Sequence, residues 1–314
     1  MNKFNYRLFR LLPLFLLSAL GSQAADPELT IATEADGWTL SAGDVTLLRY
    51  GYGAPGTPKS SVQELRTPSG INVLRDATVE HADHPHHRGL MFAVGVDGTD
   101  FWHEHGLQPS ETAQVRMTDR PDGHGRQAFM EETVQWVVRN SGVVLLEENR
   151  QITACRLDRP SVTLLTWESR LTPANGVARI LSGTSYFGLG IRMVETMDGG
   201  RRFSSASEEA DHAPHDQHLI DAAWAAYLAH AAGQPVTVAL FDHPDNPRHP
   251  ARMFTMNSFG YLSATLNLEQ QTLSIEPDQT LRLRYGVAVA DGFLDRPAME
   301  ALYAQWLETT RTTD

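Results

Sequence analysis

The densest group of side chains able to transfer protons or hold a metal lies in residues 83–89, which read DHPHHRG. Imidazole exchanges protons near neutral pH and is the commonest metal ligand in proteins. A packed core rarely contains so many ionisable neighbours. We therefore interpret the segment as a site, in which His87 and Arg88 act on the ligand and His84 and His86 hold it. In an extended chain, His84 and His86 share one side and His87 points to the other.

A second histidine-rich segment follows at residues 100–105, which read DFWHEH. His103 and His105 stand two residues apart, a spacing that lets both side chains share one face of a strand. Trp102 is predicted to bind substrate by stacking on a sugar ring. The alternative for Trp102 is a place in the hydrophobic core, which is the commoner position of an aromatic residue at a strand end.

The third segment, residues 241–249, reads FDHPDNPRH and comes directly after a strand-like run. Polar side chains at the end of a strand on a rigid sheet are well placed to form a site. We predict that His243 lies in the same pocket as His87 and Arg88, with one imidazole acting as the general base and the other as the general acid. Asn246 is predicted to orient substrate hydroxyls, although turn formation is the ordinary use of such a residue.

Two other features concern the partners of these histidines. Arg192 follows a glycine-containing run at residues 187–190, where the backbone can approach a ligand, and its planar fork suits a carboxylate or hydroxyl groups. Glu104, Glu168 and Glu276 are the candidate carboxylate partners, and the sequence does not choose between them.

A divalent metal ion could serve as a cofactor, since it would assist the reaction by polarising a sugar carbonyl. The cofactor stays unknown at this point, since no motif here has the specificity of the His-Glu-x-x-His pattern. The candidate metal ligands are His86, His103, His105 and His243.

Apolar residues at every second position predict half-buried strands along most of the chain. Residues 281–290 show this most clearly, and similar patterns occur at 134–138, 162–171 and 236–240. Turn signals such as Asn-Gly and Asp-Gly separate the strands. The pattern predicts an all-β protein, a large antiparallel β-sandwich. One C-terminal helix is expected to begin near Asp295 and to pack on the sandwich.

Residues 1–25 have the pattern of a signal peptide, with three basic residues, a short apolar run and small residues before the cleavage point. The protein is therefore expected to be periplasmic or secreted, with residues 26–314 forming a single β-sandwich domain. No later segment is apolar enough for stable membrane insertion. The chain has 26 Lys and Arg against 38 Asp and Glu, a net charge of −12, which disfavours nucleic acid as a partner. Its one cysteine, Cys155, is expected to be a buried structural thiol.

These motifs together resemble the PmoA-like family, a domain of unknown function found in exported proteins of glycan-degrading bacteria. The resemblance rests on the histidine segments at 83–89 and 241–250 and on residues 66–70, 100–102 and 187–192. It implies a carbohydrate ligand and supplies no reaction. The chain length and the ending at residues 273–285 resemble the galactose-mutarotase-like supersandwich.

The leading functional hypothesis is an exported carbohydrate-active enzyme that uses histidine and carboxylate acid–base chemistry on a small sugar or an oxidised (keto) glycoside. An epimerase, a lyase or a hydrolase would each fit, with or without a metal ion. The alternative is a non-catalytic glycan-binding protein, which would need aromatic platforms but no dense group of histidines.

Overall fold

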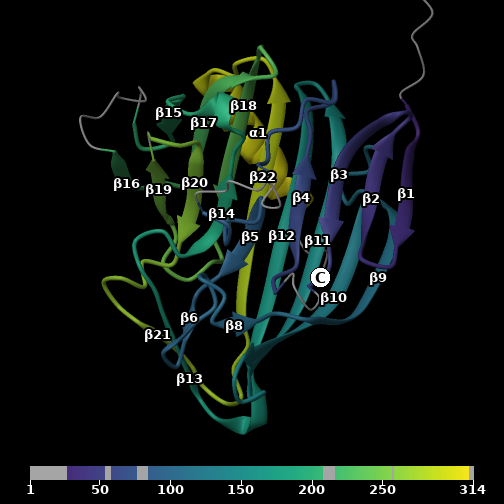
Figure 1. Cartoon of the computed structure of the whole chain (residues 1–314). Coiled ribbons are helices and arrows are strands. Elements are labelled where there is room, and N and C mark those ends of the chain that lie inside the picture. The colour runs from purple at the N-terminus through teal and green to yellow at the C-terminus, as the bar shows by residue number, and fades with distance from the viewer. Residues whose placement is uncertain (1–26, 54–57, 76–83, 208–215, 257, 311–314) are drawn as a thin grey trace, which may run out of the picture.

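The computed structural model describes residues 27–53, 58–75, 84–207, 216–256 and 258–310. Within these residues, two large antiparallel sheets of nine strands each pack face to face, and one α-helix lies near the C-terminal end (Figure 1). The predicted all-β sandwich with a C-terminal helix is confirmed. The predicted signal peptide, residues 1–25, lies outside the described residues.

The first sheet is a meander that is completed by strands from the middle and late parts of the chain. Its strands, in spatial order, are β1 (Leu29–Glu34), β2 (Gly37–Ala42), β3 (Val45–Gly51), β4 (Ser61–Leu65), β5 (Leu90–Ala93), β14 (Gly188–Arg192), β20 (Tyr261–Thr265), β19 (Arg252–Met256) and β16 (Gln217–Asp221).

The second sheet contains the longest strands. In spatial order they are β15 (Arg201–Ser204), β17 (Trp224–Ala231), β18 (Gln234–Asp242), β22 (Leu281–Asp291), β12 (Ser161–Pro173), β11 (Val144–Asp158), β10 (Arg126–Val138) and β8 (Gly106–Leu107), with β9 (Ser110–Asp119) also paired to β10. A small third sheet joins β21 (Leu273–Ile275), β13 (Arg179–Ser182), β6 (Gly95–Val96) and β7 (Thr99–Asp100). Short 3-10 turns occupy Ala174–Gly176 and Glu195–Met197.

Side-chain alternation assigns each face of the first sheet. Phe92 on β5 pairs in register with Leu189 on β14, and its ring lies 5.9 Å from that of Trp136 on β10. Paired residues point to the same side of a sheet, so this side faces the second sheet. Side chains alternate along a strand, so Gly190 and Arg192 of β14 point the other way from Leu189 and lie on the outer face of the first sheet.

The outer face of the second sheet is covered in part by α1 (Arg296–Thr309), which lies behind β18 and β22 in Figure 1. Asp295 caps the helix by accepting a hydrogen bond from the backbone N–H of Ala298 at 3.0 Å. Met299, Leu302 and Trp306 pack on the sheet and are buried, so the helix packs on the sandwich as expected.

Two smaller expectations can be compared with the described part of the chain. Cys155 is buried on the outer face of the second sheet, and burial raises the pKa of its thiol to about 11. Among the described residues, no helix combines the length and the apolar character needed to cross a membrane.

Candidate active site on the first sheet

Three histidines gather at the start of β5, in a turn that joins the chain to the first sheet. The backbone N–H of His87 donates to the carbonyl of His84 at 3.0 Å, which closes the turn. Gly89 follows with φ +62°, and a Cβ there would come within 2.3 Å of the Val62 carbonyl oxygen. Only glycine fits this close approach to β4. The chain is not extended here, and the turn brings all three imidazoles to one place.

The rings of these histidines contact one another and a fourth imidazole. His84 and His87 are stacked with their centroids 4.7 Å apart, and His86 lies 4.6 Å from His87. His86 also lies 4.7 Å from His103, which comes from the segment after β7. We call His84, His86, His87 and His103 the histidine cluster.

Two members of the histidine cluster are held in the neutral form. Burial, with a smaller contribution from His103 and Lys59, lowers the pKa of His86 to about 4. Burial, with contributions from the neighbouring imidazoles and Arg192, lowers the pKa of His87 to about 2. Both rings therefore stay uncharged at neutral pH and can each donate and accept one hydrogen bond. The buried Nδ1 of His87 has no hydrogen-bond partner among the described residues.

His103 forms a carboxylate–imidazole pair at the exposed edge of the cluster. Its Nδ1 lies 2.6 Å from Oδ2 of Asp100, and its backbone N–H donates to Oδ1 of the same carboxylate at 2.9 Å. Burial raises the pKa of Asp100, but these bonds outweigh it and hold the pKa below its ordinary value. An ionised Asp100 fixes the proton on Nδ1 of His103 and leaves Nε2 as an acceptor. The His103 side chain is 37% exposed, so a ligand can reach it.

Arg88 is bound to Glu104 rather than directed at a ligand. Its Nε donates to one carboxylate oxygen at 2.5 Å, and a terminal nitrogen donates to the other at 3.2 Å. Glu104 adopts a left-handed backbone conformation, with φ +69°. Of the three candidate carboxylates, Glu104 is therefore the one that lies beside the cluster. The catalytic role predicted for Arg88 becomes a positioning role, because a bidentate pair already uses its fork.

Lys59, which no sequence motif indicated, also supports the histidine cluster. Its ammonium donates to the carbonyls of Trp102 at 2.6 Å and His86 at 3.0 Å, and lies 3.7 Å from Glu104. The side chain is fully buried, and desolvation lowers its pKa from 10.5 to about 7, although Glu104 opposes this. The rarity of lysine could have drawn attention to this residue, since Lys59 and Lys3 are the only lysines in the chain.

Lys59 makes stability depend on pH. The unfolded chain keeps this proton up to about pH 10.5, whereas the folded protein loses it near pH 7. The unfolded state therefore binds more protons between these values, and the free energy of unfolding rises with pH in this window. From pH 7 to pH 9 the rise from this one group is about 2 kcal/mol.

The Lys59→Met variant is expected to lose this rise. Urea unfolding of both proteins at pH 7, 8 and 9 measures it, and the titration of Cys155 and other groups is common to both and cancels in the difference. Parallel stability curves for the two proteins would show that Lys59 keeps an ordinary pKa in the fold.

Arg192 and an aromatic layer form the base of the cluster on the outer face of the first sheet. The Arg192 guanidinium is buried and lies 3.8 Å from the ring centroid of Phe259. The His87 ring stacks on Tyr261, with centroids 5.3 Å apart. The structure thus brings the predicted ligand-binding residue Arg192 together with the histidine cluster.

Trp102 belongs to the same layer, but the sugar-stacking role predicted for it is wrong. Its side chain is completely buried, stacked on Phe187 at 5.3 Å and met edge-on by Tyr186 at 5.6 Å. A Cβ on Gly190 would come within 2.8 Å of the Trp102 ring. Both faces of the indole are occupied by protein, so Trp102 shapes the layer and offers no face to a ligand.

His243 does not reach the histidine cluster, and the prediction of one shared pocket is wrong. It follows β18 on the outer face of the second sheet, where its ring contacts Trp306 of α1 at 5.7 Å and its Nε2 lies 3.3 Å from Arg284. The two sites therefore lie on opposite outer faces of the sandwich. The reason is alternation: Asp242 pairs in register with the core residue Tyr285, so the next residue, His243, points to the outer side.

Asn246 also has a structural role in place of the predicted substrate contact. Its amide donates to Asp242 at 2.7 Å and to the carbonyl of Arg284 at 2.7 Å, and its oxygen accepts from the Arg284 backbone N–H at 2.7 Å. These bonds fix the loop after β18, as turn chemistry suggests.

The four candidate metal ligands do not form one site. His86 and His103 are neighbours, whereas His243 lies on the opposite face and His105 is exposed. Within the described residues, no three His, Cys, Asp or Glu side chains are arranged to hold a metal ion. What the cluster does provide is one carboxylate-oriented imidazole beside two neutral imidazoles and a buried arginine.

Comparison with solved structures finds similar sandwich folds in other proteins. The chain matches the GH36 α-galactosidase AgaB of Geobacillus stearothermophilus with a TM-score of 0.52 at 10% identity, covering 84% of this chain and 41% of that one. It thus spans about two fifths of the length of the galactosidase. A putative aldose 1-epimerase from Klebsiella pneumoniae matches with a TM-score of 0.48 at 8% identity, over 88% of this chain and 84% of that one. A galactose mutarotase-like protein from Clostridium acetobutylicum gives 0.44 at 9% identity, over 85% and 99%.

Comparison at the level of sequence families corrects the PmoA-like resemblance. No curated protein matches the chain. The family that does match covers residues 37–304 and is described as DUF6807, a family of unknown function, so the PmoA-like assignment is wrong. The match includes both the histidine cluster and the segment around His243. The chain belongs to the DUF6807 family.

Proposed function

We propose that this protein is an exported carbohydrate-active enzyme that transfers a proton at a sugar, with His103 as the general base. The observation that carries the proposal is the 2.6 Å contact between Asp100 and His103 at the accessible edge of the histidine cluster. A base whose tautomer and direction are set by a carboxylate is an arrangement suited to proton abstraction.

The remaining groups of the cluster have complementary uses. The neutral rings of His86 and His87 can exchange hydrogen bonds with sugar hydroxyls, which are both donors and acceptors. The Arg192 guanidinium supplies a fixed positive charge close to His87, where it would stabilise an oxyanion that forms as the proton leaves. This set suits removal of a proton next to a sugar carbonyl, as an epimerase or a lyase acting on an oxidised sugar requires.

The test is conversion of sugars in D2O, followed by NMR. Purified protein is incubated with a panel of aldoses and keto-sugars, and Asp100→Asn serves as the matched variant because it keeps the shape of the pair while removing the charge. Deuterium appearing at the carbon next to the carbonyl, or an elimination product, is the expected result, with a strongly reduced rate in Asp100→Asn.

Two outcomes would contradict the proposal. Sugar binding by the wild-type protein without conversion of any panel member would identify a glycan-binding protein. If the protein neither bound nor converted any sugar of the panel, the assignment of sugars as its ligands would be excluded altogether.

A further inference from the structure

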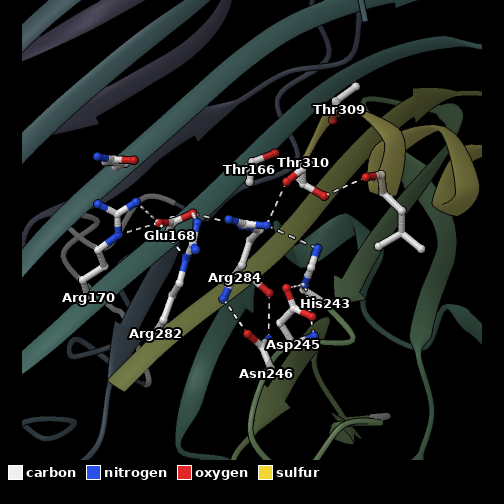
Figure 2. A network of polar contacts seen from close by, with 12 residues as sticks. Thr166, Glu168, Arg170, His243, Asp245, Asn246, Arg282, Arg284, Thr309 and Thr310 are labelled. Carbon is white, nitrogen blue, oxygen red and sulfur yellow. Dashed lines mark hydrogen bonds and ion pairs between the residues drawn. The ribbon is translucent and has the colours of Figure 1, made fainter. Parts of the chain in front are cut away.

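A second polar group lies on the outer face of the second sheet, where three arginines converge on one carboxylate. Glu168 on β12 accepts hydrogen bonds from Arg170 at 2.8 Å, from Arg282 at 3.1 Å and from Arg284 at 2.9 Å (Figure 2). The β12–β22 register places Glu168 directly opposite Arg284, and Arg170 opposite Arg282. The group carries a formal charge of +2 on a chain whose net charge is −12.

The arginines of this group keep donors available. Arg282 uses Nε and one terminal nitrogen on Glu168, and Arg170 does the same, so the other terminal nitrogen of each has no hydrogen-bond partner among the described residues. The side chains of Arg170 and Arg282 are 41% and 40% exposed, whereas that of Arg284 is nearly buried. Two of the three guanidiniums can therefore reach a ligand without leaving Glu168.

These arginines border a groove of about 340 Å³, a size that accommodates a small organic molecule rather than an inorganic ion alone. We call it the arginine groove. Its remaining polar lining consists of Gln127, Gln151, Thr153, Thr166, Thr309 and Thr310. Hydroxyl and amide groups of this kind exchange hydrogen bonds with the hydroxyls of a saccharide. Phe129 adds an aromatic ring to the lining.

We propose that the arginine groove is a binding site for an acidic saccharide, in which Arg170 and Arg282 hold the carboxylate of a uronic acid residue and the groove lining binds the sugar hydroxyls. A guanidinium matches a carboxylate in planar, two-bond geometry. The site lies on the face opposite the histidine cluster, so it binds the saccharide independently of the proposed catalytic site.

Calorimetric titration at low salt tests the site with a galacturonic acid disaccharide. The wild-type protein is expected to bind it, and 0.5 M NaCl is expected to weaken binding because partly exposed charges are screened. The double variant Arg170→Gln/Arg282→Gln is expected to bind on the order of 10- to 100-fold more weakly, the usual value of lost charge-assisted hydrogen bonds.

The matched control is Arg49→Gln, which removes an arginine charge from β3 in the first sheet, where Arg49 pairs with Glu34 and Asp36. Its affinity for the disaccharide should equal that of the wild type.

Three results would overturn the proposal. Equal affinity of the wild type and the double variant would show that the arginines bind only Glu168. If the protein bound the neutral galactose disaccharide as tightly as the galacturonic acid disaccharide, the carboxylate would have no role in recognition. Inorganic phosphate that binds as tightly as the disaccharide would show that the groove recognises any small oxyanion and no saccharide.

Discussion

His103→Ala is expected to lower kcat/KM by about 10²- to 10⁴-fold for the sugar that the wild-type protein converts, the usual contribution of a general base. The fold should be retained, because the side chain lies at the exposed edge of the histidine cluster and packs against little of the core. Asp100→Asn should reduce the rate in a similar way, since Asp100 sets the tautomer of the ring. Steady-state kinetics with unfolding midpoints for each variant measure both effects.

The pH profile of kcat/KM gives a second readout. Neither His86 nor His87 titrates between pH 5 and 8, because burial lowers their pKa values to about 4 and about 2. An acidic limb of kcat/KM in this range therefore comes from neither of these two rings, and alanine at His86 or His87 should leave its midpoint unchanged.

Two histidines serve as controls for this prediction. His105 is exposed and two residues from His103, and His243 lies on the opposite face, so alanine at either position should leave kcat/KM within about twofold of the wild type, a change worth only about 0.4 kcal/mol. Full activity in His103→Ala together with a large loss in His243→Ala would move the catalytic role to the second sheet.

Arg150→Met is expected to lower the free energy of unfolding by about 3–5 kcal/mol, because it leaves two buried carboxylates without their cation. Arg150 is fully buried between the sheets, donates to both oxygens of Glu148 at 2.8 Å, and lies 3.3 Å from Glu132. It also donates to the hydroxyl of Tyr50 at 3.0 Å, which links the second sheet to the first. Guanidinium chloride unfolding measures the loss.

The matched control for stability is Arg170→Gln on the neighbouring strand. Arg170 pairs with Glu168, and its side chain is 41% exposed. Exposed ion pairs of this kind contribute about 1 kcal/mol or less to the free energy of unfolding. Adding Glu148→Gln to Arg150→Met should recover part of the stability, because it removes one of the stranded charges. An equally small effect of Arg150→Met and Arg170→Gln would show that water reaches the buried network.

The strands and the site of the histidine cluster were predictable because both depend on local sequence. Alternation over residues 281–290 and 162–171 marked β22 and β12, and the capping residue Asp295 marked the start of α1. Three of the cluster members lie within four residues of one another, so no long-range information was needed to group them.

The tertiary structure decided which polar residues share a face and how the groups from distant strands meet. A shift of one residue moves a side chain to the other side of a sheet, so His243 faces α1 although Asp242 beside it pairs in register with the core residue Tyr285. Glu168 and Arg284 are 116 residues apart and meet because β12 and β22 pair in one register. Local patterns predict strands but carry no information on register between distant strands. The histidine segments were therefore read from the sequence, while the arginine groove and the separation of His243 from His87 followed only from the pairing of the strands.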